Sequence, residues 1–161
     1  MFELKTVQTE NKSALYKELA TQAHALLHGE HDLIANAANL CALLYHALPD
    51  INWVGFYFLK DGEMVVGPFQ GKPACVRIAL GKGVCGIAAV KRETILVQDV
   101  NQFPGHIFCD SDSRSEIVLP LIRRGELLGV LDIDSPKLAR FDEEDRFNLE
   151  KLSRVFLDAL G

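Results

Sequence analysis

Four cysteines, at positions 41, 75, 85 and 109, carry the thiol chemistry that this sequence could perform. No two of them form a C-x-x-C pair, so neither a zinc ribbon nor a thioredoxin-type redox motif is predicted. Cys109 lies in a long polar segment, residues 101–115, where a hydrophobic residue has no packing role. Of the four cysteines, it is therefore the strongest candidate for a thiol with a chemical function. Cys85 follows a glycine turn at an expected helix N-terminus, a position that favours a thiolate. The residues alone favour simple packing for Cys41 and Cys75.

Two aspartates, Asp132 and Asp134, stand two positions apart in an expected strand and therefore share one face. Leu128 and Val130 extend that face and are apolar, which indicates that part of it is covered. Carboxyl groups at the edge of a covered face titrate abnormally and can act as an acid or as a cation ligand. A solvent-exposed polar alternation has the same spacing, so both interpretations stay open at this point.

The segment from Gly81 to Gly86 matches the pattern G-x-G-x-x-G between an expected strand and an expected helix. A dinucleotide site is not predicted, because no second parallel strand ending in an acidic residue follows at the required distance. The turn instead offers free backbone N–H groups to an anion such as a carboxylate, although a turn that only packs has the same sequence. His24, His28 and His31 lack further ligands of metal-site type, so no metal site is expected.

The elements that hold these residues follow from the hydrophobic periodicity, which predicts an α+β fold. A first helix is expected from an N-cap at Ser13 to Gly29, and a second from Asp32 to Pro49. Strands are expected at 52–59, 64–66, 75–80, 94–97, 117–122 and 126–133, with a short helix ending at Val90 between the third and the fourth. Asp142 caps a C-terminal helix. This order predicts an antiparallel sheet with the N- and C-terminal helices packed on one face.

Composition limits the classes of partner and compartment. The chain has 161 residues, a length typical of one domain, and no internal repeat, so a single domain over residues 1–161 is expected. Its net charge of −5 argues against a nucleic acid or an anionic membrane as partner. The sequence starts without a signal peptide. None of its apolar runs approaches the length of roughly 18 residues that is needed to span a bilayer. We therefore expect a cytoplasmic protein.

Motifs along nearly the whole chain resemble those of the free methionine-(R)-sulfoxide reductases, a family of GAF domains. The closing hairpin and last helix, with residues 117–136 followed by 141–145, resemble GAF domains in general. The more specific match is carried by three cysteines and their surroundings, at 52–57, 67–71, 75, 81–86, 106–110 and 113–117.

The resemblance implies a thioredoxin-dependent enzyme that reduces the R epimer of free methionine sulfoxide, needs no cofactor and forms a homodimer. In such enzymes the thiol at the position of Cys109 attacks the sulfoxide sulfur and becomes a sulfenic acid. The thiol matching Cys85 then closes a disulfide with Cys109, and the one matching Cys75 is an accessory. One of the clustered acids must donate a proton to the departing oxygen, with Glu116 and Asp134 as the candidates.

The same resemblance implies the residues that hold the substrate. Glu116, Asp132 and Asp134 would hold the ammonium group and the sulfoxide oxygen. The backbone amides at Gly83 and Val84 suit the carboxylate, and the aromatic wall that receives the methyl group has two members in this sequence, Trp53 and Tyr57.

A non-catalytic GAF module that senses a small molecule is the alternative. It would share the fold and the pocket, but it has no need for thiols at both Cys85 and Cys109.

Overall fold

An antiparallel sheet with helices on both faces organises the chain in the computed structural model, which describes residues 1–6 and 11–161. Within these residues the sheet has six strands in the order β3-β2-β1-β6-β5-β4. The strands are β1 (Trp53–Lys60), β2 (Glu63–Gly71), β3 (Arg77–Ala79), β4 (Ile95–Val97), β5 (Ser115–Arg123) and β6 (Glu126–Ser135). The helices are α1 (Lys12–Leu27), α2 (Leu33–Ala47), α3 (Gly83–Lys91) and α4 (Glu143–Ala159), with a 3-10 turn at Val100–Gln102. All paired strands are antiparallel, which confirms the α+β class.

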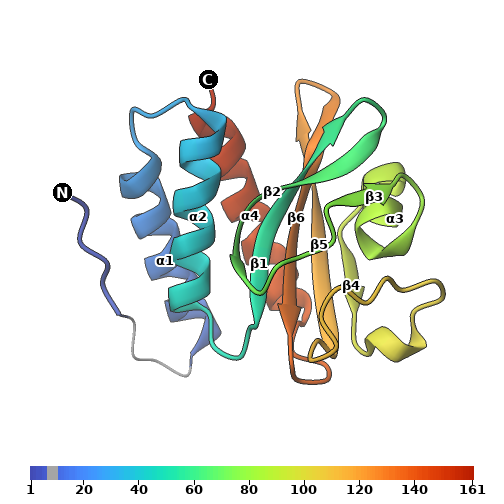
Figure 1. The fold of residues 1–161 in the computed structure, drawn as a ribbon. Helices are drawn as coiled ribbons and strands as arrows, with labels where there is room; N and C mark the ends of the chain where they lie inside the picture. Colours follow the sequence, from blue (N-terminus) through green and yellow to red (C-terminus); the bar gives the residue numbers. More distant parts are fainter. Residues whose placement is uncertain (7–10) are drawn as a thin grey trace.

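The helices divide between the two faces of the sheet. Helices α1, α2 and α4 lie together on one face, and α3 lies on the other with the loops that join it to the sheet (Figure 1). The expected packing of the N- and C-terminal helices on one face is confirmed. The larger hydrophobic core fills the space between these three helices and the sheet, and a smaller core lies under α3.

Strand β6 serves both cores through the alternation of its side chains. Leu131 and Ile133 are fully buried in the larger core. Val130 belongs to the smaller core, and Asp132 and Asp134 line a pocket on that same side. The predicted division of this strand into an apolar face and an aspartate face is thus confirmed from Val130 to Asp134. The placement of Leu128 on the aspartate face is wrong: Leu128 packs against the larger core, because the pairing of β5 with β6 shifts by one residue between Leu121 and Ile122.

Capping residues fix the ends of the helices largely where the sequence predicts them. The Asp142 carboxylate accepts from the backbone N–H of Asp145, and the Asp145 side chain accepts from the N–H of Asp142, which forms a capping box at the start of α4. Asp32 caps α2 as expected. The N-cap of α1 is Asn11 instead of Ser13, because the Asn11 side chain accepts from the N–H of Ala14 and allows the helix to begin earlier.

The strand expected at 75–80 is shorter than predicted. Only Arg77–Ala79 pairs with β2, so Cys75 lies in the loop that precedes β3. This loop follows Pro73, which has no N–H for a ladder, and Cys75 is bonded to another part of the chain, as described below. Among the residues that the structure describes, no helix has the length and apolar character needed to cross a membrane.

Candidate active site

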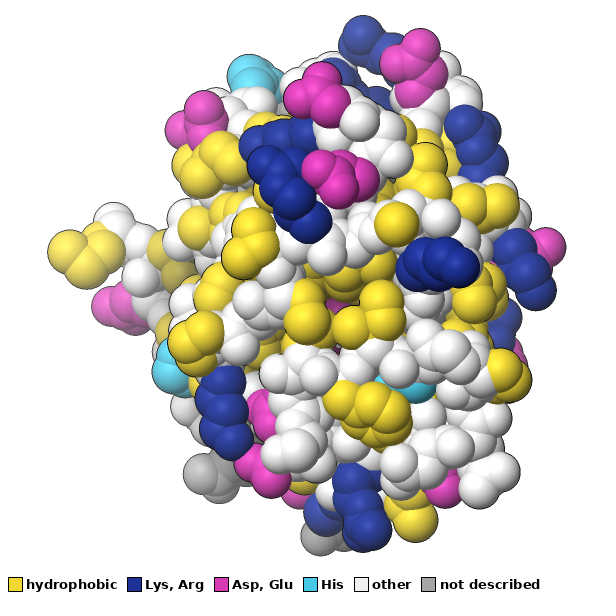
Figure 2. All heavy atoms as spheres, turned by 45° about the vertical axis from the view of Figure 1, so that its right-hand side comes forward, with side chains coloured by type: hydrophobic (Ala, Val, Ile, Leu, Met, Phe, Trp, Pro, Cys, Tyr) yellow, Lys and Arg dark blue, Asp and Glu magenta, His cyan; other side chains and the backbone are white. Residues whose placement is uncertain are grey.

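A pocket opens on the sheet face that carries α3. Its walls come from β1, β5 and β6, from the N-terminus of α3, and from the loops around residues 73–74 and 106–113. Figure 2 views the molecule from this side and shows a hollow bordered by hydrophobic side chains with an acidic side chain visible inside it. The cavity volume is about 40 Å³, which corresponds to only a few water molecules.

Three carboxyl groups meet at the floor of the pocket. Glu116 on β5 lies opposite Asp134 on β6, and Asp132 follows one pleat along on the same face. Glu116 and Asp132 are each only 6% exposed. Burial raises the pKa of all three carboxyl groups well above the usual range, and repulsion among them raises it further. Both effects favour the protonated form of these groups, which is the direction that a proton donor requires.

His106 is a pocket residue whose contact with the acid cluster the sequence did not indicate. Its Nε2 lies 3.2 Å from Glu116 Oε1, and the side chains of both residues are 7% exposed. Burial lowers the pKa of His106, which favours the neutral imidazole. The loop that carries Cys109 turns the His106 ring toward Glu116. His106 therefore positions the Glu116 carboxyl group.

Two aromatic side chains form one wall of the pocket, as the resemblance implies. Trp53 and Tyr57 on β1 have ring centroids 5.9 Å apart, and both are almost fully buried. The indole N–H of Trp53 donates to the carbonyl oxygen of Lys72 at 3.1 Å. A Cβ at Gly55 would lie 2.4 Å from the indole ring, so only glycine leaves room for Trp53 in this orientation.

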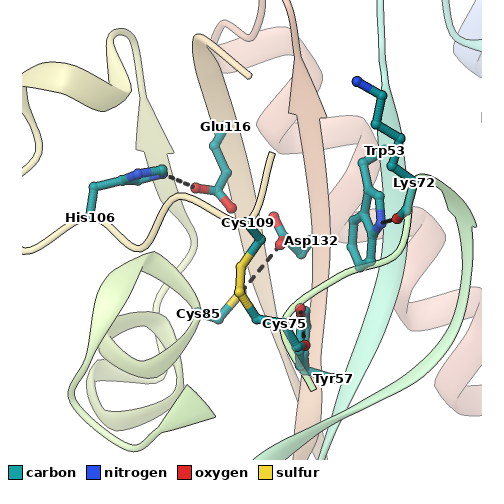
Figure 3. Close-up of a disulfide and its surroundings, with 9 residues drawn as sticks. All are labelled: Trp53, Tyr57, Lys72, Cys75, Cys85, His106, Cys109, Glu116 and Asp132. Carbon is teal, nitrogen blue, oxygen red and sulfur yellow. Dashed lines mark hydrogen bonds and ion pairs between the residues drawn. A yellow bond between two sulfur atoms is a disulfide. The ribbon is translucent and has the colours of Figure 1, made fainter. Parts of the chain in front are cut away.

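A disulfide joins Cys75 to Cys109 across 34 residues, with their Cα atoms 5.6 Å apart. The expected disulfide between Cys85 and Cys109 is therefore wrong for this structure. The loops before β3 and β5 bring Cys75 and Cys109 together at the pocket's edge, whereas Cys85 lies in the pocket interior as a free, buried thiol. Figure 3 shows the disulfide in front of the acid cluster, with Cys85 approaching from α3.

The environment of Cys85 also corrects the expectation of a stabilised thiolate. The residue does lie in the first turn of α3, but it is only 4% exposed, and its thiol donates to Asp132 Oδ2 at 3.4 Å. Burial raises the pKa of the Cys85 thiol well above its usual value, and the neighbouring carboxylates add to this effect. Desolvation and like charge outweigh the helix dipole here.

The start of α3 forms another part of the pocket lining. Gly83 and Val84 lie there, and the N-cap residue Lys82 makes no capping hydrogen bond with its side chain. Gly83 has a φ of +61°, and a Cβ at this position would meet the side chain of Ile107 at 2.9 Å. Glycine therefore allows the chain both to turn and to approach the loop that carries Cys109.

The loop that carries Cys109 is tied to the opposite wall by polar contacts. The Asn52 side-chain amide donates to Asp110 at 3.3 Å and to Ser113 at 3.1 Å. The Lys72 ammonium group lies 3.6 Å from Asp110 and 2.6 Å from Asp112. Sequence reasoning named none of these as site residues, because the contacts join segments about 40 to 60 positions apart.

Among the residues that the structure describes, possible metal ligands meet in the pocket. Ligand atoms of Cys85, Glu116 and Asp132 all lie within 4.8 Å of one another. His31, in contrast, is exposed and pairs through Nδ1 with the carbonyl oxygen of Ala159. The fourth cysteine, Cys41, is buried in the larger core, as expected from its position on α2.

Comparisons with known proteins place this chain in a family. The model of the GAF domain matches residues 31–160. The chain is 52% identical over 156 residues to protein YtsP of Bacillus subtilis, covering 96% of each chain. It is 51% identical over 142 residues to the free methionine-R-sulfoxide reductase of Escherichia coli, covering 88% of this chain and 86% of that protein. The structure of the Neisseria meningitidis free methionine-R-sulfoxide reductase in complex with its substrate superposes with a TM-score of 0.95 at 44% identity, covering 99% of this chain and 96% of that one.

Proposed function

This chain belongs to the GAF-domain family and, within it, to the free methionine-R-sulfoxide reductases, and we propose that it reduces the R epimer of free methionine sulfoxide to methionine. The observation that carries this proposal is the disulfide between Cys75 and Cys109 beside three carboxyl groups, of which Glu116 and Asp132 are buried. Sulfoxide reduction needs both components, a thiol that is oxidised and an acid that protonates the departing oxygen.

In the first step, the Cys109 thiolate attacks the sulfur of the sulfoxide. A carboxyl group of the cluster donates a proton to the sulfoxide oxygen, and Glu116 and Asp134 are the candidates. The oxygen is transferred to Cys109 as a sulfenic acid, and methionine leaves. The raised pKa values of the carboxyl groups support this step, because a group that is still protonated at neutral pH can act as the acid.

In the second step, the Cys75 thiol attacks the sulfenic acid, so that the disulfide forms and water is released. This assignment moves the resolving role from Cys85 to Cys75, in keeping with the observed bond. Two electrons from an external dithiol then restore both thiols. Thioredoxin is the reductant that we propose, and a disulfide with an exposed partner at Cys109 supports access by another protein.

The two charged ends of a free amino acid fit the two polar sides of the pocket. Asp132, Asp134 and Glu116 would bind the ammonium group. The backbone N–H groups at Gly83 and Val84, at the start of α3, would bind the carboxylate. Trp53 and Tyr57 would contact the methyl group.

The homodimer, which the family resemblance implies, stays a prediction that gel filtration tests. The cytoplasmic location also stays a prediction, and cell fractionation tests it.

A sensor module would use the same fold, and the redox pair is the feature that argues against it. Binding alone gives no reason for two cysteines to meet at the edge of a pocket that holds three carboxyl groups. The simplest test is to mix protein, dithiothreitol and racemic methionine sulfoxide and to measure methionine.

The substrate class is tested by comparing free methionine sulfoxide with its N-acetylated form. We expect consumption of the free R epimer and at least a hundredfold loss with the acetylated compound, since a buried charged site left without its partner costs several kcal/mol. Comparable rates on both compounds would remove the ammonium contact from the proposal, and no methionine from either would favour the sensor.

A further inference from the structure

The proposed reaction uses the thiols of Cys75 and Cys109 and leaves that of Cys85 without a role. Cys85 is nonetheless held in the pocket and directed at the acid cluster, where its thiol donates to Asp132 Oδ2 at 3.4 Å (Figure 3). Ordinary packing does not require this contact, because a buried cysteine usually behaves as a small hydrophobic residue.

The surroundings of Cys85 provide further ligand atoms. Its sulfur and one oxygen each of Glu116 and Asp132 lie within 4.8 Å of one another. Asp132 is 6% exposed, and its second oxygen, Oδ1, is buried without a hydrogen-bond partner. A buried polar atom that lacks a partner is costly, so this oxygen marks a place for a ligand.

Sulfur and carboxylate oxygens in this arrangement suit a zinc ion. Zn²⁺ takes tetrahedral ligands with zinc–sulfur distances of about 2.3 Å and zinc–oxygen distances of about 2.0–2.2 Å, so neighbouring ligand atoms lie roughly 3.3–3.7 Å apart. The distance between Cys85 Sγ and Asp132 Oδ2 is within that range. Small shifts of the Glu116 side chain would bring one of its oxygens to a similar distance. The Glu116 carboxyl group already pairs with His106, and contacts of this kind orient the residues that bind a metal.

We propose that Cys85, Glu116 and Asp132 form a Zn²⁺ site in the substrate-free protein, and that zinc bound there excludes methionine sulfoxide. Binding replaces the thiol proton and the carboxyl protons, which are released to solvent, and no electron is transferred. The positive ion occupies the place that the proposed function assigns to the substrate's ammonium group, so the exclusion rests on that function. Zinc binding itself does not depend on the proposed function.

The oxidised protein isolates the proposed site, because Cys75 and Cys109 are then joined to each other and cannot bind a metal. Chelator-treated oxidised protein is titrated with Co²⁺, a spectroscopic substitute for zinc. We expect one equivalent to bind, with the absorption of a thiolate bound to cobalt, and Zn²⁺ to displace it. No binding, or binding without the thiolate absorption, would overturn the proposal.

Matched variants identify the ligands. Cys85→Ser should abolish the thiolate absorption and weaken binding by at least tenfold, whereas Cys41→Ser, a buried thiol in the other core, should leave both unchanged. Asp132→Asn should weaken binding and retain the absorption. The proposal fails if the absorption persists in Cys85→Ser or disappears in Cys41→Ser. If Cys85→Ser does not fold, Asp132→Asn still decides, since unchanged affinity there contradicts the assignment.

A separate experiment tests the exclusion of substrate. Zn²⁺ should inhibit methionine formation by the reduced wild-type protein competitively, raising KM without changing kcat, and Cys85→Ser should resist inhibition at least tenfold better. Metal-free protein that makes no methionine contradicts the proposed function, whereas an active protein that binds no metal contradicts only the zinc site. Inhibition that lowers kcat alone would refute competition.

Discussion

The hydroxyl group of Tyr57 donates a hydrogen bond to the backbone carbonyl oxygen of Cys75 at 2.9 Å. Tyr57 belongs to the aromatic wall of the pocket, and Cys75 forms half of the disulfide. One contact therefore holds the resolving cysteine's loop against the wall that would receive the substrate.

Removing this hydroxyl group should slow disulfide formation. In Tyr57→Phe the Cys75 loop loses one hydrogen bond, worth about 1 kcal/mol, so a roughly fivefold slower closure is expected. Rapid-quench mass mapping of the disulfide after a single turnover measures this rate. Methionine release in the same experiment serves as the control, because attack by Cys109 precedes closure, and a larger effect on release than on closure would contradict the assigned role.

Replacing the cysteines one at a time should separate their roles. Cys109→Ser should abolish methionine formation, because a hydroxyl group is far less ionised than a thiol. Cys75→Ser should release about one methionine per site and then stop when thioredoxin is the reductant, since the sulfenic acid has no intramolecular partner. Cys85→Ser, the matched control, should keep turning over. Arrest in Cys85→Ser together with sustained turnover in Cys75→Ser would return the resolving role to Cys85.

The acid cluster should make the protein less stable as the pH rises. Its carboxyl groups bind protons more tightly in the folded state, so their stabilising contribution is complete below the unfolded pKa of about 4 and is lost as pH rises through the folded values. Asp134→Asn should therefore increase the free energy of unfolding at pH 8 by about 1–2 kcal/mol and change it little at pH 4. Urea unfolding at both pH values measures this.

The same substitution should reduce turnover by roughly 10²–10⁴-fold if Asp134 donates the proton. Asp158→Asn, which removes an exposed carboxylate from α4, is the control and should alter neither stability nor turnover. An Asp134→Asn protein that is equally destabilised at both pH values would contradict the buried-charge explanation.

The disulfide form should bind ligand poorly, because its cavity has a volume of only about 40 Å³. Trp53 is the chain's single tryptophan and lines this cavity, so its fluorescence reports occupancy. Methionine should alter the fluorescence of the reduced protein and leave the oxidised protein unchanged up to at least tenfold higher concentration. Equal responses in the two states would show that the pocket does not need to widen.

A second buried acid, far from the pocket, should determine stability instead of activity. Asp145 is fully buried and accepts hydrogen bonds from Tyr16 at 2.7 Å and from Lys12 at 2.6 Å, with Arg140 at 3.4 Å. Asp145→Ala leaves the buried Arg140 without this partner and should cost roughly 3–5 kcal/mol. Glu143→Ala, whose side chain is 82% exposed, should cost less than about 0.5 kcal/mol in the same unfolding experiment.

Local patterns predicted most of the fold. The alternation around Asp132 and Asp134 identified both faces of β6, and Asp32 and Asp142 identified the starts of two helices. These features depend on neighbours within a few positions, which a sequence displays directly. The N-cap at Asn11 was missed by two positions because Asn and Ser suit that role about equally well.

The errors in the site arose where distant segments meet. The sequence favoured a thiolate at Cys85 from the helix dipole, but it could not show that burial in the pocket, with Asp132 only 3.4 Å away, would reverse that effect and raise the pKa of the thiol. The pairing of Cys75 with Cys109 depends on how two loops approach each other, and the contact of His106 with Glu116 depends on how one loop turns. No spacing in the chain encodes either distance.

The alternation along β6 also bears on how such a protein can change over generations. Leu131 and Ile133 hold the helical layer in place, and Asp132 and Asp134, which alternate with them, face the pocket. A substitution on the pocket face leaves the packing of the helical face intact, so ligand preference can drift while the fold is retained. Substitutions on the two faces of β6 can therefore change the pocket and the packing of the fold independently of each other.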